Sequence, residues 1–338
     1  MPSSPPPSAA PPVPFVDVGA GGGLALLAAA PERAQRLLDL AERRYLGRVP
    51  LRLADRESRR WLARSGNPYL AEIDAVAEAV GRPGAHMLNL SFEWACTAAV
   101  GPDPQGVGAR LLRTLDWKLE GLGETVMVAR HDGPAGPWLS VTWPGFVGAL
   151  TVLAPGRFAA AINQPPMRMT RIGPLGMPVV IDWLAVRSRV LRSTALPPAH
   201  LLRQVCETAR DYGEARRMLA AVPVCIPAFY TLCGLAADEG CLIERLERQA
   251  FSFEAPVCAA NHWLAPGQTG RPRRLSPERQ AFLSGRMSTA EGLDWLEPPV
   301  LNPTTRVAVL ANPATGRLLV QGAEPRGPVT APTLLAAA

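Results

Sequence analysis

A cysteine, an arginine and an aspartate are spaced so that one β-hairpin would bring them together. Cys96 begins the apolar stretch 96–100, and Arg113 and Asp116 follow after a turn rich in glycine and proline. Two paired strands would return both residues to the side of Cys96. A neighbouring cation favours the thiolate, and a carboxylate can orient an amine or a guanidinium. The pattern allows nucleophilic chemistry at Cys96, although a small core cysteine is the commoner use of such a residue.

A second candidate residue ends a strand-like stretch farther along the chain. This residue is Asn163, and a turn containing two prolines follows it. Beside a nucleophile, a side-chain amide can donate to an oxyanion, which is worth ~3 to 4 kcal/mol for one such donor in another enzyme. A polar residue that simply ends a strand would look the same. From the residue types alone, both interpretations of Asn163 stay open.

The order of residues around the cysteine resembles that of a known enzyme family. Residues 96–117 contain Cys-Thr followed by Arg-x-x-Asp and an aromatic residue. This order resembles the N-terminal-nucleophile amidases of the acid ceramidase and N-acylethanolamine acid amidase group, with bile-salt hydrolase and penicillin V acylase as more distant relatives. In that family, the cysteine becomes the nucleophile only after the chain cuts itself on its amino side. The resemblance therefore implies cleavage between Ala95 and Cys96.

The resemblance also implies further site residues. Residues 257–263 resemble the family segment that carries its second oxyanion donor, and residues 276–280 resemble the segment that carries a late active-site arginine. Gln164 stands where the ceramidases have a glutamate. The implied site residues are Cys96, Arg113, Asp116, Asn163, Gln164, Asn261 and Arg279.

Each of these residues takes a role from the family pattern. The freed α-amine of Cys96, with a reference pKa of ~7.7 to 8, would accept the proton of its own thiol. Asp116 would orient that amine, and the two arginines would hold the cysteine environment or a polar substrate group. The two asparagines would donate hydrogen bonds to the oxyanion. His262 could also act as a base, but a histidine beside a tryptophan at a strand end is more typical of packing.

The implied function is hydrolysis of a linear N-acyl amide, with a fatty-acyl or similar acyl group, through a thioester acyl-enzyme. No metal or organic cofactor is required for this chemistry. Expected partners are the small-molecule substrate and the cleaved N-terminal segment of the chain itself, with peripheral membrane or lipid contact left open. Two alternatives remain: an acyltransferase that passes the same acyl group to an amine, and a degenerate, uncleaved protein that only binds acyl ligands.

Composition limits the other classes of function. The chain has 338 residues, 48% of them hydrophobic, which is ample to bury a core. Its net charge is +6, but the cations are almost all arginines spread along the chain, so nucleic acid is not an expected partner. The six cysteines form no C-x-x-C pair, which indicates reduced core thiols and no zinc site.

The N-terminal part is expected to differ from the rest. Seven of the first fourteen residues are proline, so residues 1–14 are predicted to be a disordered tail. The glycines of residues 16–23 resemble an S-adenosylmethionine-binding turn, but no βαβ unit follows them, and a flexible link is the favoured interpretation. No apolar run approaches the ~20 residues that span a bilayer, and the basic start of a secretory signal is missing, so a cytoplasmic location is expected.

Hydrophobic periodicity predicts how the chain positions these residues. Helices are predicted over 31–45, 55–64 and 67–81, so residues 15–95 should form a helical segment that precedes a catalytic domain at 96–330. Hairpins are predicted from strands 125–130 with 138–143, and 146–153 with 157–163. Helices over 181–221 and further strand pairs at 229–247 and 305–321 follow. This order suits an α+β fold, the four-layer αββα sandwich of the resembling family, with an N-terminal helical segment.

Overall fold

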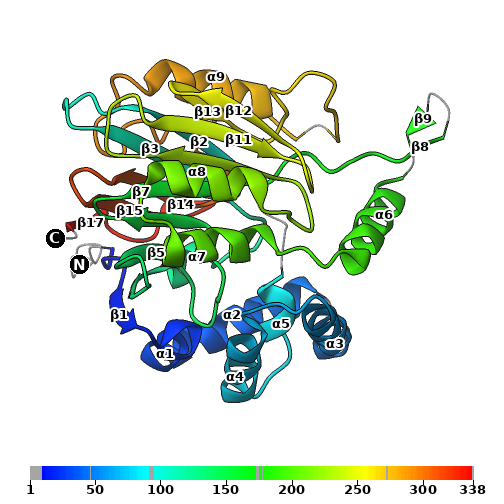
Figure 1. Cartoon of the computed structure of the whole chain (residues 1–338). Coiled ribbons are helices and arrows are strands. Elements are labelled where there is room, and N and C mark those ends of the chain that lie inside the picture. Colours follow the sequence, from blue (N-terminus) through cyan, green and yellow to red (C-terminus); the bar gives the residue numbers. More distant parts are fainter. Residues whose placement is uncertain are drawn as a thin grey trace, which may run out of the picture.

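Two β-sheets packed face to face form the centre of the computed structural model, which describes residues 10–45, 47–90, 95–172, 175–176, 178–271 and 273–336 (Figure 1). Sheet A contains, in spatial order, β1 (Phe15–Gly19), β4 (Met127–His131), β5 (Trp138–Thr142), β6 (Thr151–Ala154), β7 (Phe158–Asn163), β10 (Ala228–Cys233), β11 (Gly240–Arg245) and β12 (Ala250–Glu254). Sheet B contains β13 (Val257–Ala259), β2 (Ala95–Pro102), β3 (Ala109–Asp116), β14 (Thr305–Asn312), β15 (Arg317–Glu324) and β16 (Gly327–Pro328), and β17 (Thr333–Ala336) also pairs with β15. Neighbouring strands are antiparallel, except that β1 is parallel to β4.

Helices cover the outer faces of both sheets. Helices α7 (Pro198–Thr208) and α8 (Tyr212–Ala221) lie against sheet A, and α9 (Ser276–Arg286) lies against sheet B (Figure 1). The largest group of buried apolar side chains fills the space between the two sheets and beneath α7 and α8. The predicted α+β, four-layer αββα sandwich is therefore confirmed.

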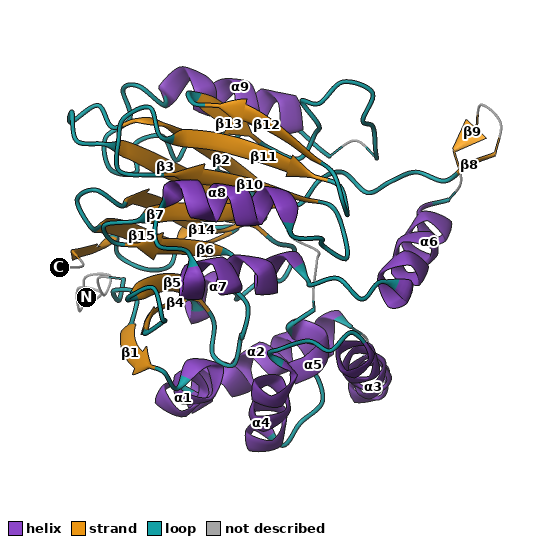
Figure 2. Cartoon of the chain, in the orientation of Figure 1, coloured by secondary structure: helices purple, strands orange, loops and turns teal. Residues whose placement is uncertain are grey.

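The N-terminal helices gather at one end of the sandwich (Figure 2). They are α1 (Gly22–Ala29), α2 (Pro31–Arg44), α3 (Arg48–Arg64), α4 (Leu70–Val80) and α5 (Ala85–Leu88). Helix α4 ends at Gly81 in the left-handed conformation, with φ of 65°, as its position after the apolar stripe predicts. It begins later than expected because the Asn67 side chain accepts a hydrogen bond from the Tyr69 amide at 3.0 Å in the preceding turn.

The prediction of a purely helical segment over residues 15–95 was wrong at its start. Residues Phe15–Gly19 form β1, an edge strand of sheet A. The following glycines are not a flexible link either, because α1 begins at Gly22 and the Gly23 amide donates to Glu72 Oε1 at 2.6 Å. A side-chain carboxylate thus occupies the helix terminus that a methyltransferase would offer to its ligand.

The predicted disordered tail was also wrong in its last part. Residues 1–9 lie outside the described residues. Val13, however, is only 2% exposed, and its amide donates to Thr333 Oγ1 at 2.8 Å. The Pro11 carbonyl accepts a hydrogen bond from Ala331, so this segment is tied to the C-terminal part of the chain.

The remaining predicted elements appear with changed lengths. The expected strand over 146–153 shortens to β6, because Val147 donates its amide to Asn89 Oδ1 at 2.7 Å and the chain turns there. Helix α6 (Val179–Arg192) leaves the sandwich (Figure 1) and is joined to α3 by side-chain hydrogen bonds. Trp183 on it is 47% exposed. The short pair β8 (Arg171–Ile172) and β9 (Leu175–Gly176) precedes it. All six cysteines are free and buried, as predicted. Among the described residues, no helix is long and apolar enough to span a membrane.

Candidate active site

The β2–β3 hairpin brings the predicted residues together. Cys96 is paired with Leu115, and Ala95 is paired with Asp116 at the open end of the hairpin. Side chains alternate between the two faces of a strand. Cys96 and Arg113 therefore face sheet A, whereas Asp116 faces α9 on the other side of sheet B. The predicted hairpin is confirmed, but the Asp116 carboxylate and the thiol lie on opposite faces of it.

Arg113 is the direct neighbour of the Cys96 thiol. Its Nη2 donates to Cys96 Sγ at 3.2 Å and to the Ile162 carbonyl at 3.1 Å, and its Nη1 donates to Thr151 Oγ1. Cys96 is fully buried. Burial raises the pKa of the Cys96 thiol, and the positive charge of Arg113 opposes this rise. In the intact chain, the thiol is accordingly held in its protonated form at neutral pH.

Arg279 on α9 connects the main chain at Cys96 with its surroundings. Its Nη1 donates to the Cys96 carbonyl at 3.2 Å, to Thr97 Oγ1 at 2.9 Å and to Asp116 Oδ2 at 3.0 Å. Its Nη2 donates to Asn261 Oδ1 at 2.7 Å. A planar guanidinium suits this task because its five N–H groups point in fixed directions. Arg279 thus fixes the relative positions of β2, β3 and the residues that follow β13.

Asn261 contacts the peptide bond at which cleavage is predicted. Its Oδ1 accepts the Cys96 amide hydrogen at 3.2 Å, and its Nδ2 donates to the Gln164 carbonyl at 2.7 Å. Its own amide donates to Ser276 Oγ at 2.8 Å, and His262 Nδ1 lies 2.8 Å from the same hydroxyl. His262 therefore supports the residue that holds Asn261, which agrees with its interpretation as a packing residue.

Asn163 and Gln164 lie at the end of β7, beside this group. Asn163 Nδ2 donates to the carbonyls of Ala259 and Ala260 at 3.2 and 3.3 Å, and so holds the end of β13 instead of Cys96. Its Oδ1 is buried and has no hydrogen-bond partner among the described residues. Gln164 Oε1 accepts a hydrogen bond from Arg273 Nη2 at 3.0 Å. The oxyanion role of Asn163 stays a prediction.

Two residues that contact Asp116 were not identified from the sequence. Thr305 Oγ1 donates to Asp116 Oδ1 at 2.9 Å, and Asn302 Nδ2 donates to Oδ2 at 3.2 Å. Burial raises the pKa of the Asp116 carboxyl, and Arg279 and these two donors oppose the rise. The sequence offered one signal, the asparagine-containing turn that precedes β14. Such turns commonly precede strands, so this one did not indicate a contact with Asp116.

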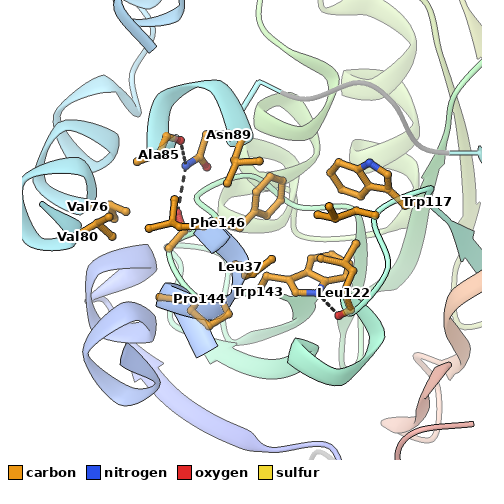
Figure 3. A pocket seen from close by; sticks show the side chains of 15 residues that line it. Leu37, Val76, Val80, Ala85, Asn89, Trp117, Leu122, Trp143, Pro144 and Phe146 are labelled. Carbon is orange, nitrogen blue, oxygen red and sulfur yellow. Dashed lines mark hydrogen bonds between the residues drawn. The ribbon is translucent and has the colours of Figure 1, made fainter. Parts of the chain in front are cut away.

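An apolar pocket lies between the N-terminal helices and the sandwich (Figure 3). Trp117, which follows Asp116, contributes to its wall. The cavity volume is about 70 Å³, and its lining comes from α2, α4, α5 and the loops after β3 and β5. Asn89 is the polar member of the lining, and its Nδ2 donates to the carbonyls of Ala85 and Gly145 at 2.9 and 3.1 Å. Within the described residues, no three His, Cys, Asp or Glu side chains gather as metal ligands would.

Comparisons with known proteins agree with this geometry. No protein-family model matches the chain. Acid ceramidase of Bos taurus is 29% identical over 152 residues, 45% of this chain and 35% of that protein, and the Homo sapiens enzyme is 28% identical over 150 residues, 44% and 34% of the two chains. The chain thus matches about a third of the length of these relatives.

A solved structure supports the fold. The Caenorhabditis elegans N-acylethanolamine-hydrolyzing acid amidase ortholog superposes with a TM-score of 0.50 and 16% identity, covering 65% of this chain and 93% of that one. At this identity, the likeness concerns the fold alone. The chain thus shares the fold of this amidase structure, and a little under half of it is similar in sequence to the acid ceramidases.

Proposed function

We propose that the chain is a cysteine amidohydrolase that cleaves a linear N-acyl amide through a thioester acyl-enzyme. The observation that supports this most is the surroundings of Cys96: Arg113 lies 3.2 Å from its sulfur, and both sides of its main chain are held by Arg279 and Asn261. A buried core cysteine needs none of these contacts. Chromatography of the products tests the proposal, because a free acid and a free amine must appear. Acyl transfer to an added amine acceptor would instead identify an acyltransferase.

The proposed first step is cleavage before Cys96. The sulfur attacks the Ala95 carbonyl carbon, the Ala95–Cys96 C–N bond breaks, and the departing nitrogen takes up a proton. This forms a thioester and a free α-amine. Water then hydrolyses the thioester, which leaves an Ala95 carboxylate and restores the thiol. The hydrogen bond from Cys96 N–H to Asn261 Oδ1 and the contact of Arg279 with the Cys96 carbonyl support a fixed peptide geometry for this step.

The cleaved N-terminal segment is expected to stay bound as the partner of the catalytic part. Main-chain hydrogen bonds join β1 to β4, including Val128 N to the Pro14 carbonyl at 2.8 Å. Glu72 and Arg203 form an ion pair at 2.7 Å across the two parts. Apolar side chains of the N-terminal helices are also buried against apolar side chains of the catalytic part. Cutting one peptide bond removes none of these contacts.

In the cleaved enzyme, the α-amine of Cys96 accepts the proton of the thiol, and the thiolate attacks the substrate carbonyl. The oxyanion that forms is stabilised by amide donors, for which Asn163 and Asn261 are the candidates. Both amides donate to main-chain carbonyls in the uncleaved chain. They must exchange these acceptors for the oxyanion once Ala95 leaves. Water then releases the acid from the thioester.

The apolar pocket beside Trp117 is the proposed acyl site, and it leads to a prediction for Leu88, which lines it. Leu88→Trp fills part of the cavity. Burying two methylenes of an acyl chain is worth ~1.6 kcal/mol, or roughly fifteenfold in kcat/KM. Of two substrates whose acyl chains differ by two methylenes, the wild type should therefore prefer the longer by about this factor. The variant should lose this preference and hydrolyse the shorter substrate at the wild-type rate. Leu235→Trp, in an exposed turn, is the control. Equal losses on both chains would contradict the assignment.

A neutral working range is expected, in keeping with the proposed cytoplasmic location. The amine must be unprotonated, so kcat/KM should rise from pH 5 to 7. Gln164→Glu adds a negative charge beside Arg273, which stabilises the ammonium form, raises the pKa of the amine and moves the acidic limb to higher pH. The matched control is Gln105→Glu, since Gln105 Oε1 lies 3.1 Å from Arg317 at the exposed end of the hairpin. A wild-type optimum below pH 5.5 would contradict both expectations.

The proposed membrane or lipid contact has its best support where α3 and α6 lie side by side. Trp61 Nε1 donates to the Ser193 carbonyl at 2.9 Å, and the Arg187 guanidinium forms an ion pair with the Glu57 carboxylate. These contacts join the two C-terminal ends and the two middles, so the helices run parallel. Their N-terminal halves therefore lie next to each other.

These N-terminal halves carry exposed apolar side chains. The residues are Val49, Leu53, Val180, Trp183 and Leu184, each between 47 and 70% exposed. Arg52 and Arg56 on α3 are exposed beside them. An apolar patch with basic neighbours suits an anionic membrane surface. We expect sedimentation with phosphatidylserine-containing vesicles, and we expect Trp183→Glu to abolish it. Unchanged sedimentation of that variant would exclude this patch.

A further inference from the structure

The turn before β14 is built around the Asp116 carboxylate. Asn302 Oδ1 accepts hydrogen bonds from the Thr304 amide and hydroxyl, at 3.0 and 2.6 Å, which leaves its Nδ2 free to donate to Asp116 Oδ2. The Asn302 amide donates to Thr305 Oγ1 at 3.0 Å, so the Thr305 hydroxyl hydrogen is directed elsewhere. Of the two acceptors within reach of this hydroxyl hydrogen, Asp116 Oδ1 at 2.9 Å is the nearer. The Thr304 carbonyl in turn accepts the Trp117 amide at 2.7 Å.

This turn lies at the point where the proposed α-amine would appear. Ala95 and Asp116 are paired in the β2–β3 register, and Cys96 directly follows Ala95. The new amino group of Cys96 therefore forms at the end of the hairpin that carries the Asp116 carboxylate. In the intact chain, the Cys96 nitrogen carries one hydrogen, which goes to Asn261 Oδ1. After cleavage, the same nitrogen carries two further hydrogens when protonated. An ionised carboxylate close to them is the acceptor that an ammonium group needs.

We propose that Asn302 and Thr305 are positioning residues that keep the Asp116 carboxylate ionised and fixed at the end of β3, so that it holds the ammonium form of the Cys96 α-amine. This inference rests on the proposed function and deepens it. Neither residue touches the thiol. Both act through Asp116, which is 1% exposed, so solvent cannot replace their hydrogen bonds.

The charged and titratable groups around Asp116 do not make these two donors redundant. Arg279 from α9 forms the ion pair at 3.0 Å, and Arg113 from β3 and Arg306 from β14 act at longer range. The Cys96 thiol on β2 is a further titratable neighbour. Arg279 already serves three other acceptors. Asp116 Oδ1 depends on Thr305 instead, because Arg279 and Asn302 both donate to Oδ2.

The test is the pH dependence of kcat/KM for N-acyl amide hydrolysis by the full-length chain and three variants. Thr305→Ser keeps the hydroxyl donor and should match the wild type. Thr305→Val keeps the shape but removes the donor, which raises the pKa of Asp116. The carboxylate then holds the ammonium form less well, so the pKa of the amine falls and the acidic limb should move down by about one pH unit. Asn302→Asp keeps the acceptor for Thr304 but replaces the donor by a second carboxyl that competes with Asp116 for one negative charge, and its limb should move in the same direction as that of Thr305→Val.

Other outcomes overturn the inference and can be told apart. If Thr305→Val and Asn302→Asp lose activity by the same factor at every pH, both residues are merely structural. Thermal unfolding of each variant identifies one that fails to fold, and Asn302→Asp and Thr305→Val are independent probes of the same carboxylate. Wild-type curves from both variants would show that Asp116 does not need these donors. A wild type that hydrolyses no N-acyl amide removes the proposed function itself and this inference with it.

Discussion

Replacing Arg279 by methionine is expected to slow self-cleavage by a factor of at least about 10², because the groups that it holds would no longer be fixed around Cys96. The change removes the donor shared by the Cys96 carbonyl, Asp116 and Asn261. It also leaves the Asp116 carboxylate buried without its partner cation, since Arg279 is 3% exposed. Breaking a buried ion pair from one side costs about 3 to 5 kcal/mol in the free energy of unfolding. Gel electrophoresis over time and urea unfolding measure the two effects.

Arg110→Met is the matched control for this experiment. Arg110 is also buried, lies on β3 like Asp116 and joins that strand to the end of α9, where its guanidinium donates to the carbonyls of Met287 and Ala290 at 2.7 Å each. Its loss should destabilise the protein but leave the cleavage of the folded fraction at the wild-type rate. If Arg279→Met is cleaved as fast as Arg110→Met, the assignment of Arg279 is wrong.

Cys96→Ala is expected to abolish both reactions, because it removes the attacking sulfur and no thioester can form. The purified variant should remain a single chain and hydrolyse no N-acyl amide. Activity assays and denaturing electrophoresis measure this. The fold should persist, since the change removes one sulfur atom from a site that Ala98 and Val100 continue to fill.

Cys258→Ala serves as the control for the loss of a buried thiol. Cys258 lies on β13, is paired with Ala99 of β2 and is 4% exposed. It contacts the apolar side chains beneath α9, away from the sulfur of Cys96. This variant should cleave and hydrolyse normally. Residual amide hydrolysis by Cys96→Ala at the level of Cys258→Ala would assign the chemistry to another residue.

The central hairpin was predictable because its signals are local. The apolar run that begins at Cys96 and the turn rich in glycine and proline after it place Arg113 beside Cys96 without knowledge of the rest of the chain. The family resemblance placed Arg279 and Asn261 near the same point, and the structure does bring them there. The order of strands and helices suits two sheets between helices, and the family resemblance implied the αββα architecture.

Contacts between distant segments were not predictable in this way. The strand β1 is short and follows a proline-rich stretch, and only its pairing with β4 makes it a strand. Thr305 reaches Asp116 across 189 positions of the sequence, and no periodicity reports such a contact. Asn163 fits the family pattern at its strand end, yet its amide binds the carbonyls of Ala259 and Ala260.

The exposure of α6 also escaped the sequence pattern. Trp183 and Val190 share a helical stripe that normally indicates a face packed on the core. Trp183 nevertheless lies on the open side of the α3–α6 pair, and its ring packs against Arg187. A stripe of apolar residues predicts burial, but it cannot tell a protein core from another apolar partner.

The intact mass of the purified wild-type protein under denaturing conditions tests the central claim most directly. Cleavage before Cys96 predicts two masses, one for the segment that ends at Ala95 and one for the segment that begins at Cys96, with a sum equal to that of the whole chain plus one water. The Cys96→Ala variant should give one mass. A single mass for a wild-type protein that hydrolyses N-acyl amides at full rate would contradict the account.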